Sequence, residues 1–156
     1  NENAGRSRDP MRAIQSKTHL YLFNPWSNGE RIFATATNGT VTCKRMIKLS
    51  EEDEEMNKRL ELYRFRVPEE LYQVNKDPDC LENLIHHPNH EKTKNKLMEL
   101  LEEWMVQTKD PLLECFQNRD EPEFVEAYIQ KLEEEANARR IKEKPSKKPK
   151  KEKKKS

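Results

Sequence analysis

The stretch between Pro88 and Pro111 constrains the fold more than any other part of the chain. Its apolar side chains recur at spacings of three and four residues: Leu97, Leu100, Leu101 and Trp104, continued by Thr108. Such a stripe, with Glu and Lys at most other positions, is typical of an amphipathic helix that covers an apolar layer. Pro88 suits the first helical position, where its missing N–H costs nothing, and Asp110-Pro111 predicts the end of the helix.

Several short segments before this helix have the composition of β-strands. Met11–Asn24 predicts one or two strands with a bend near Ser16–Thr18, and Glu70–Val74 predicts another. Arg31–Ala36 and Thr40–Met46 are further candidates, separated by an Asn-Gly turn. The expected fold class is α+β, with a small antiparallel sheet of about three or four strands and two or three helices packed on one side.

Three more segments are expected to be helical. Ser50, followed by acidic residues, predicts the N-cap of a helix over Glu51–Arg64. Cys80–Leu84 is expected to form a short helical turn. A last helix over Pro122–Arg140 has apolar residues on one side: Phe124, Val125, Tyr128, Ile129, Leu132 and Ala136.

The charge of the chain is unevenly placed. The formal net charge is +1 at pH 7, yet residues 141–156 hold nine lysines and two glutamates, so the rest of the chain is acidic. We expect a polar leader (1–10), a domain (11–113), an appended amphipathic helix (114–140) and a Lys-rich tail (141–156) whose composition predicts disorder. The absence of an initiator Met fits a segment of a longer protein.

The sequence has few signs of reactive chemistry. The three cysteines form no C-x-x-C pair, which argues against a zinc ribbon or a dithiol site. His86, His87 and His90 are more typical of a solvated turn than of a metal site, because Pro88 interrupts them, and no metal is predicted. No Gly-rich phosphate loop, G-x-S-x-G elbow or H-E-x-x-H motif is present, and no apolar run approaches the roughly 20 residues of a membrane span.

Two sets of basic residues are candidates for binding an anion. Arg12, Lys17 and His19 lie on the first expected strands and have the chemistry to hold a sulfated or carboxylated ligand, or else they form the solvated face of the sheet. The Lys-rich tail has the charge to bind an anionic polymer. Because no aromatic residue is interleaved in that tail, we do not expect a nucleic-acid partner and favour a solubilising end.

Two segments resemble the C-terminal region of sulfatases. The first has Glu70-Leu71-Tyr72, Asp77-Pro78 and Asn83-Leu84 in the order of the family pattern E-L-Y-D-x-x-x-D-P-x-E-x-x-N-L. It departs from that pattern at Gln73, where the family usually has Asp, and at Cys80, where Glu is common.

The second segment resembles one branch of this superfamily. Trp104–Pro111 matches the W-x-x-x-T-x-D-P ending of N-sulfoglucosamine sulfohydrolases, also called heparan N-sulfatases or sulfamidases. Pro10–Ile14 and Tyr21–Trp26 are similar to the strand that begins this region in bacterial members. The resemblance covers about residues 9–120.

The resemblance implies the C-terminal subdomain of the alkaline-phosphatase-like sulfatase fold. Such a domain packs on the catalytic domain of the same parent chain and helps to shape the cleft for a sulfated saccharide, with Arg12, Lys17 and His19 as the substrate rim. In this family a formylglycine, made from the Cys or Ser of C/S-x-P-S/A-R, and a calcium ion belong to the N-terminal catalytic domain. Neither cofactor is expected in this chain.

No catalytic residue of the family is matched. Cys43 is followed by Lys-Arg, Cys80 by Leu-Glu and Cys115 by Phe-Gln, so none fits the formylglycine motif. The resemblance further implies a periplasmic or secreted parent that takes part in glycosaminoglycan degradation. The alternative hypothesis is a stand-alone interaction module that binds an anionic polymer through its basic tail.

Overall fold

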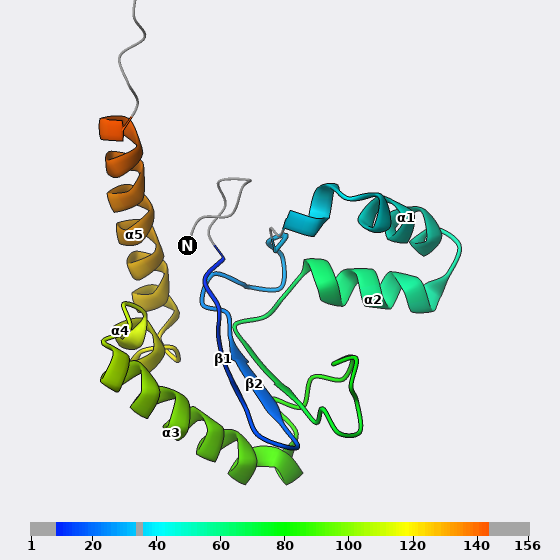
Figure 1. Cartoon of the computed structure of the whole chain (residues 1–156), viewed down its shortest axis with the longest axis horizontal. Coiled ribbons are helices and arrows are strands. Elements are labelled where there is room, and N and C mark those ends of the chain that lie inside the picture. The colour runs from blue at the N-terminus through cyan, green and yellow to red at the C-terminus, as the bar shows by residue number, and fades with distance from the viewer. Residues whose placement is uncertain (1–8, 34–35, 144–156) are drawn as a thin grey trace, which may run out of the picture.

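The computed structural model of the chain describes residues 9–33 and 36–143 (Figure 1). Its elements, in chain order, are β1 (Arg12–Gln15), β2 (Leu20–Phe23), the 3-10 helix η1 (Ala36–Gly39), α1 (Val41–Ser50), α2 (Glu54–Arg64), β3 (Glu69–Tyr72), the 3-10 helix η2 (Pro88–His90), α3 (Glu91–Thr108), α4 (Leu113–Gln117) and α5 (Pro122–Glu143). The α+β class is therefore confirmed. The predictions for the polar leader and the Lys-rich tail fall almost entirely outside the described residues.

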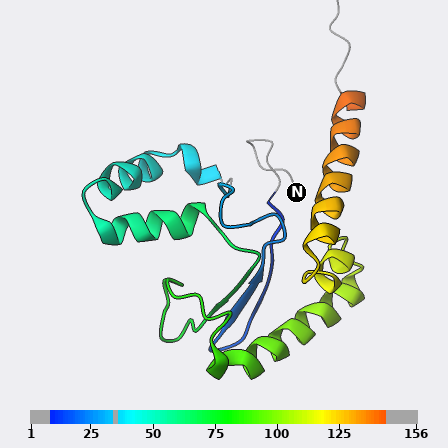
Figure 2. The same cartoon turned by 180° about the vertical axis from the view of Figure 1, so that it is seen from behind.

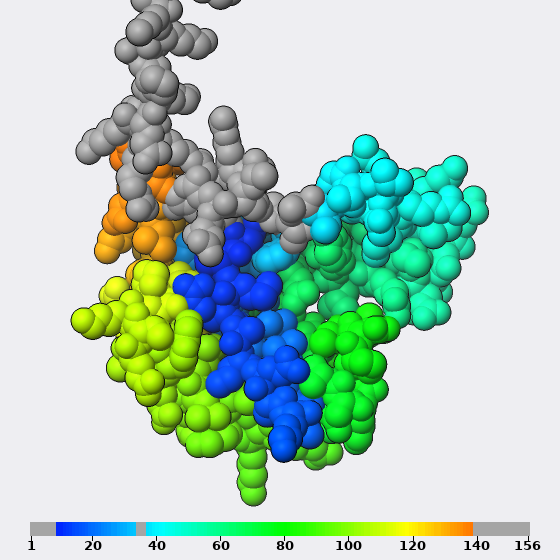
Figure 3. All heavy atoms as spheres, in the orientation of Figure 1, coloured from blue at the N-terminus to red at the C-terminus, as the bar shows by residue number. Residues whose placement is uncertain are grey.

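The sheet has three antiparallel strands in the order β1-β2-β3. Ile14 is opposite Tyr21, and Tyr21 is opposite Leu71, so these three side chains share one face. Met11–Asn24, predicted as one or two strands with a bend, contains the two strands β1 and β2, which form a hairpin closed where the Ser16 N–H donates to the His19 carbonyl at 2.8 Å. In the space-filling view, the residues around β1 form the front of the molecule, flanked on one side by α3 and α4 (Figure 3).

The core lies between one face of this sheet and the three C-terminal helices (Figures 1 and 2). Its buried members include Tyr21, Phe23, Trp26, Leu71, Leu97, Leu101, Met105, Leu112, Cys115 and Phe116. Phe23 meets Phe116 edge to face, with ring centroids 5.0 Å apart. The short helix α4, which no sequence pattern predicted, thus supplies two central side chains of the core, Cys115 and Phe116.

A helical hairpin of α1 and α2 lies on the far side of the sheet from α5 (Figure 1). Thr40 is the N-cap of α1, and its hydroxyl accepts the Cys43 N–H at 3.3 Å. Asp53 is the N-cap of α2, and its carboxylate accepts the Met56 N–H at 3.0 Å. The strand predicted over Thr40–Met46 and the cap predicted at Ser50 are therefore wrong, because side-chain caps begin both helices elsewhere.

Two other secondary-structure predictions need correction. Residues 31–33 of the strand expected at Arg31–Ala36 are not in a sheet, and Ala36 begins η1; residues 34 and 35 are outside the described part. Cys80–Leu84 forms a loop rather than a helical turn, with Cys80 in the left-handed region at φ 53°. The Asp77 carboxylate accepts the N–H groups of Leu81 and Glu82 at 2.8 and 2.9 Å, which fixes this loop without a helix.

The predicted helix after Pro88 is α3, and its end is also confirmed. Lys109 caps it in the left-handed conformation, immediately before Asp110-Pro111. Its buried face differs from the predicted stripe: Leu97, Leu101 and Met105 are buried, whereas Leu100 and Trp104 are 37% and 48% exposed. In the described part of the chain, no helix has the length and apolar character needed to cross a membrane.

Candidate functional site

Arg12, the first of the three predicted rim residues, is held by an acidic side chain. Its Nε lies 2.5 Å from Oδ2 of Asp110, and its Nη2 donates to Oδ1 at 3.0 Å. Asp110 Oδ1 also accepts the Leu112 N–H at 2.8 Å. Burial raises the pKa of Asp110, but the hydrogen bonds from Arg12 and Leu112 and the charge of Arg12 outweigh it and lower that pKa overall.

Lys17 and His19 lie at the other end of the hairpin. Lys17 is exposed in the turn, whereas His19 is buried. Nε2 of His19 is 3.1 Å from Nδ1 of His90, and its Nδ1 is 2.9 Å from the Thr18 hydroxyl. Burial lowers the pKa of His19, and the nearby charges of His90 and Lys76 lower it further. The three predicted rim residues therefore do not converge on one site.

The histidines near η2 form a small cluster around His90. Its ring centroid is 5.2 Å from those of His19 and His87. The His87 Nδ1 accepts the Asn89 N–H at 3.3 Å. Among the described residues, no group of three or more His, Cys, Asp or Glu side chains is arranged to hold a metal ion.

A buried carboxylate on the second face of the sheet is fully engaged. Glu70 is 1% exposed and accepts hydrogen bonds from Asn24 at 3.1 Å, from Tyr72 at 2.9 Å and from two nitrogens of Arg66. Burial and the adjacent Glu70 raise the pKa of Tyr72. Because neighbouring side chains engage both oxygens of the Glu70 carboxylate, we interpret this network as a structural anchor of β3.

The cysteines lack the environment of a nucleophile. All three lie in the described part of the chain and are free thiols, with Cys43 and Cys115 buried. Burial raises the pKa of Cys115 to about 11, and burial with Asp77 raises that of Cys80. A raised pKa keeps a thiol protonated near neutral pH, where only the thiolate is reactive.

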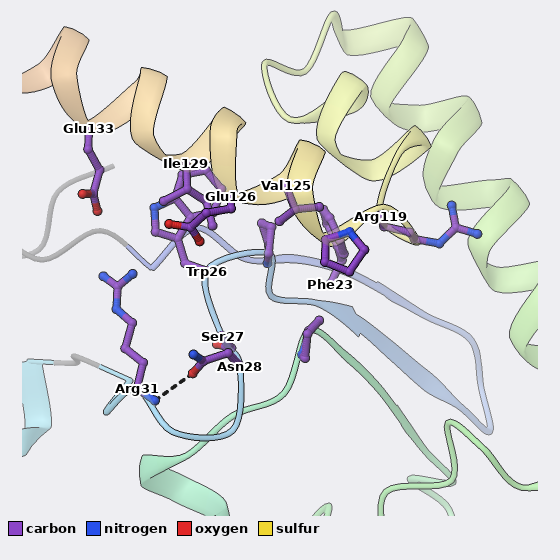
Figure 4. A pocket seen from close by; sticks show the side chains of 13 residues that line it. Phe23, Trp26, Ser27, Asn28, Arg31, Arg119, Val125, Glu126, Ile129 and Glu133 are labelled. Carbon is purple, nitrogen blue, oxygen red and sulfur yellow. Dashed lines mark hydrogen bonds between the residues drawn. The ribbon is translucent and has the colours of Figure 1, made fainter.

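A hollow of about 410 Å³ lies between the loop that follows β2 and helix α5 (Figure 4). Its apolar lining consists of Phe23, Pro25, Trp26, Pro68, Pro122, Val125 and Ile129. Its polar lining consists of Ser27, Asn28, Arg31, Arg119, Glu126 and Glu133. This mixture of an apolar wall and a few polar groups is typical of a small-molecule site.

The loop side of the hollow is shaped by an Asn turn. The Asn28 side-chain oxygen accepts the N–H groups of Glu30 and Arg31 at 3.0 and 2.8 Å. Arg31 is thereby directed toward α5, and Figure 4 shows its guanidinium and the Glu133 carboxylate pointing toward each other from opposite walls. Nη2 of Arg31 also lies 3.6 Å from the carboxylate of Asp9.

Among the side chains that line the hollow and carry a polar atom, that of Trp26 is the most buried. It is 4% exposed, and its indole Nε1 has no hydrogen-bond partner among the described residues. Figure 4 shows this nitrogen on the side of the ring that faces Arg31 and Glu133. Buried donors without a partner are rare in folded proteins, so this group needs an explanation.

Arg119 closes the other end of the hollow. Its guanidinium stacks 4.8 Å from the centre of the Phe116 ring and donates to the Phe116 carbonyl at 2.9 Å. Its Nε is 3.4 Å from Glu69 Oε1, which also accepts the Tyr21 hydroxyl at 2.5 Å. Burial raises the pKa of Tyr21, and Glu69 raises it further. Arg119 is therefore a fixed part of the wall.

No sequence pattern predicts the hollow. Pro25–Gly29 has the composition of a turn, and nothing local indicates that Trp26 meets a helix about a hundred residues later. The one available signal was a Trp within a Pro and Asn-Gly turn. Comparison of the sequence with protein-family models and with curated proteins gives no match.

Proposed function

We propose that this chain is the C-terminal domain of a sulfatase, of the N-sulfoglucosamine sulfohydrolase type. It packs on the catalytic domain of its parent and helps to shape the cleft for a sulfated saccharide, and it is not catalytic alone. The observation that carries the proposal is where the residues of the sulfatase-like pattern lie. They hold the sheet, its closing loop and α3 together, and none of them forms a reactive cluster in the part of the chain that the structure describes.

The first part of the pattern closes the free edge of β3. The Asn83 side-chain oxygen accepts the Leu71 N–H at 2.9 Å, and the Leu84 N–H donates to the Leu71 carbonyl at 2.7 Å. Asp77 fixes the loop between them, as described above. Asp77 and Asn83 make these bonds with their side chains, which gives both residues a structural role in a domain that ends a sheet.

The second part of the pattern ends α3 and returns to the sheet. The Thr108 hydroxyl donates to the Trp104 carbonyl at 2.8 Å, and Asp110 binds Arg12 of β1. Trp104 itself is 48% exposed, on the same helix as the exposed side chains of Leu100 and Val106. Exposed apolar side chains on a helix that also covers a core are typical of a surface that meets another domain.

The proposal assigns the chemistry to the partner domain. The formylglycine and the calcium ion would lie there, and this chain would contribute a rigid wall to the cleft. The parent would be periplasmic or secreted and act on a sulfated saccharide.

Two experiments test this proposal. One reads the upstream reading frame, and the other measures sulfate release by the joined protein and by the isolated chain. We expect the frame to encode a C/S-x-P-S/A-R motif. We also expect the joined protein to release sulfate from N-sulfoglucosamine, whereas the purified 156-residue chain does not. Turnover by the isolated chain, or an upstream frame without the motif, would refute the proposal.

A matched pair of substitutions tests the docking surface. Trp104→Lys should leave the isolated chain folded and reduce the activity of the joined protein about tenfold, by placing a charge in a buried interface. Val41→Lys, at a side chain of α1 that is 84% exposed, should change neither. Equal activity of both variants would show that α3 does not face the catalytic domain.

A further inference from the structure

The hollow between the loop after β2 and α5 has features that the proposed function does not use. It combines a buried donor, two cations, two carboxylates and an apolar wall within about 410 Å³. We propose that it binds one anionic sugar unit, with the acidic group of the sugar on Trp26 Nε1 and Arg31. This inference neither requires nor excludes a sulfatase parent.

The indole N–H of Trp26 is a hydrogen-bond donor that the described part of the protein leaves unused. The ring is 96% buried by its neighbours, so the N–H cannot be solvated freely, and no described residue accepts from it. A ligand oxygen placed in the hollow would satisfy this donor. The site therefore selects for a hydrogen-bond acceptor at this point.

A positive charge lies beside the indole N–H of Trp26. The Arg31 guanidinium lies at the same side of the hollow as the indole nitrogen (Figure 4). A guanidinium has five N–H donors in a fork, so Arg31 can keep its contact with Asp9 and still bind a second acid. The acceptor that suits Trp26 and Arg31 together is an oxyanion, such as a carboxylate or a sulfate ester.

Residues of α5 form the opposite wall of the hollow. Glu126 and Glu133 are two turns apart on α5, so both face the hollow, and their carboxylates accept hydrogen bonds but cannot donate them. They suit hydroxyl groups and repel a second negative charge. Val125 and Ile129 supply an apolar surface for the C–H face of a ring. A polyhydroxylated ring with one acidic group matches this arrangement, whereas an acidic peptide does not.

Trp26 provides a direct spectroscopic test. The full chain has two tryptophans, Trp26 and Trp104, so the ¹⁵N-labelled protein gives two indole N–H signals, assigned with Trp104→Phe. The probes are glucuronic acid, glucose 6-sulfate and glucose at constant ionic strength. We expect both acidic sugars to shift the Trp26 signal, glucose to bind at least about tenfold more weakly, and Trp104 to stay unchanged. The comparison of the two acids distinguishes a carboxylate from a sulfate ligand.

Variants separate the site from general charge effects. Arg31→Gln should weaken the binding of glucuronic acid about tenfold, and Glu133→Gln should change it less, because it replaces one hydroxyl acceptor with a donor and also removes a negative charge that repels the acid. Arg59→Gln, an exposed cation on α2, is the matched control and should change nothing. No shift at Trp26 with either acid, an equal shift with acetate or inorganic sulfate, or tighter binding of a triglutamate peptide would each overturn the proposal.

Discussion

Arg12 and Asp110 lie 98 positions apart in the sequence and are joined by two hydrogen bonds between a guanidinium and a carboxylate. The carboxylate is 6% exposed and the guanidinium 23%. The pair connects the first residue of β1 to the residue that follows the cap of α3. It therefore fixes how the main helix crosses the sheet, and it commits Nε and Nη2 of Arg12 to Asp110 while Nη1 donates to the Met11 carbonyl.

Removing the charge of Asp110 should destabilise the domain. We expect Asp110→Asn to lower the free energy of unfolding by about 2 kcal/mol, because it leaves a half-buried guanidinium without its counter-ion. Glu54→Gln, which removes an exposed partner of Lys58, is the control and should cost no more than about 0.5 kcal/mol. Urea denaturation at pH 7 measures both. Equal losses in the two variants would contradict a structural role for the Asp110 pair.

The Arg12–Asp110 pair also predicts that the stability of the domain depends on pH in the acid range. The pKa of Asp110 is lowered in the folded state, so its contribution is present above the unfolded value of about 4 and is lost as the pH falls through the folded value. The difference in stability between the native chain and Asp110→Asn should therefore shrink below about pH 4. Urea denaturation of both proteins between pH 7 and pH 3 measures this difference, and a constant difference would contradict the assignment.

His19 predicts a second dependence on pH, at a higher value. Its pKa is lowered by burial and by the facing groups His90 and Lys76, so the unfolded chain binds a proton more readily than the folded one. Stability should fall as the pH drops below about 6.5, with a slope of at most about 1.4 kcal/mol per pH unit for this one proton. His19→Gln should flatten the slope between pH 7 and pH 5. His86→Gln, at an exposed residue, should leave it unchanged, and a flattening by His86→Gln alone would point to a different histidine.

Two adjacent leucines on α3 give a matched test of its orientation. Leu101 is 1% exposed and Leu100 is 37% exposed. Leu101→Ala should cost about 2–5 kcal/mol, because it opens a cavity in the core, whereas Leu100→Ala should cost less than about 1 kcal/mol. Thermal or urea unfolding of the isolated chain measures both. The reverse order would mean that α3 presents its other flank to the sheet.

Local sequence patterns were sufficient to predict the strands β1, β2 and β3 and the helices α3 and α5. Alternation around Ile14 and the apolar run at Leu20–Phe23 depend only on neighbouring residues, as does the run of apolar residues in α5. The orientation of α3 was missed for a different reason. Spacing shows that Leu100, Leu101 and Trp104 lie on one broad side of the helix, but only the position of the sheet decides which flank is buried.

The helical hairpin and the hollow could not be predicted because their causes are distant. Helix α1 has Val41 84% exposed and only Cys43 buried, so its apolar residues do not mark a face that the rest of the domain buries, and it packs against α2. Trp26 and Arg31 line the hollow together with residues of α5, and no local sequence pattern connects the loop after β2 with that helix. Nor does any local pattern show that the distant residues Asp110 and His90 contact Arg12 and His19, whose role at a substrate rim stays a prediction.

The N-cap of α2 was predicted at Ser50 and lies at Asp53, and this difference can be tested directly. Asp53→Ala should cost about 1 kcal/mol, because its carboxylate accepts the Met56 N–H at the N-terminus of the helix. Ser50→Ala should cost less than about 0.5 kcal/mol, since the Ser50 hydroxyl only donates to the Ile47 carbonyl at the end of α1. Because the α1–α2 hairpin packs apart from the sheet, it can open locally, so amide hydrogen exchange at Met56 is the sharper measurement. We expect faster exchange in Asp53→Ala and no change in Ser50→Ala, and faster exchange in Ser50→Ala alone would restore the cap that the sequence predicted.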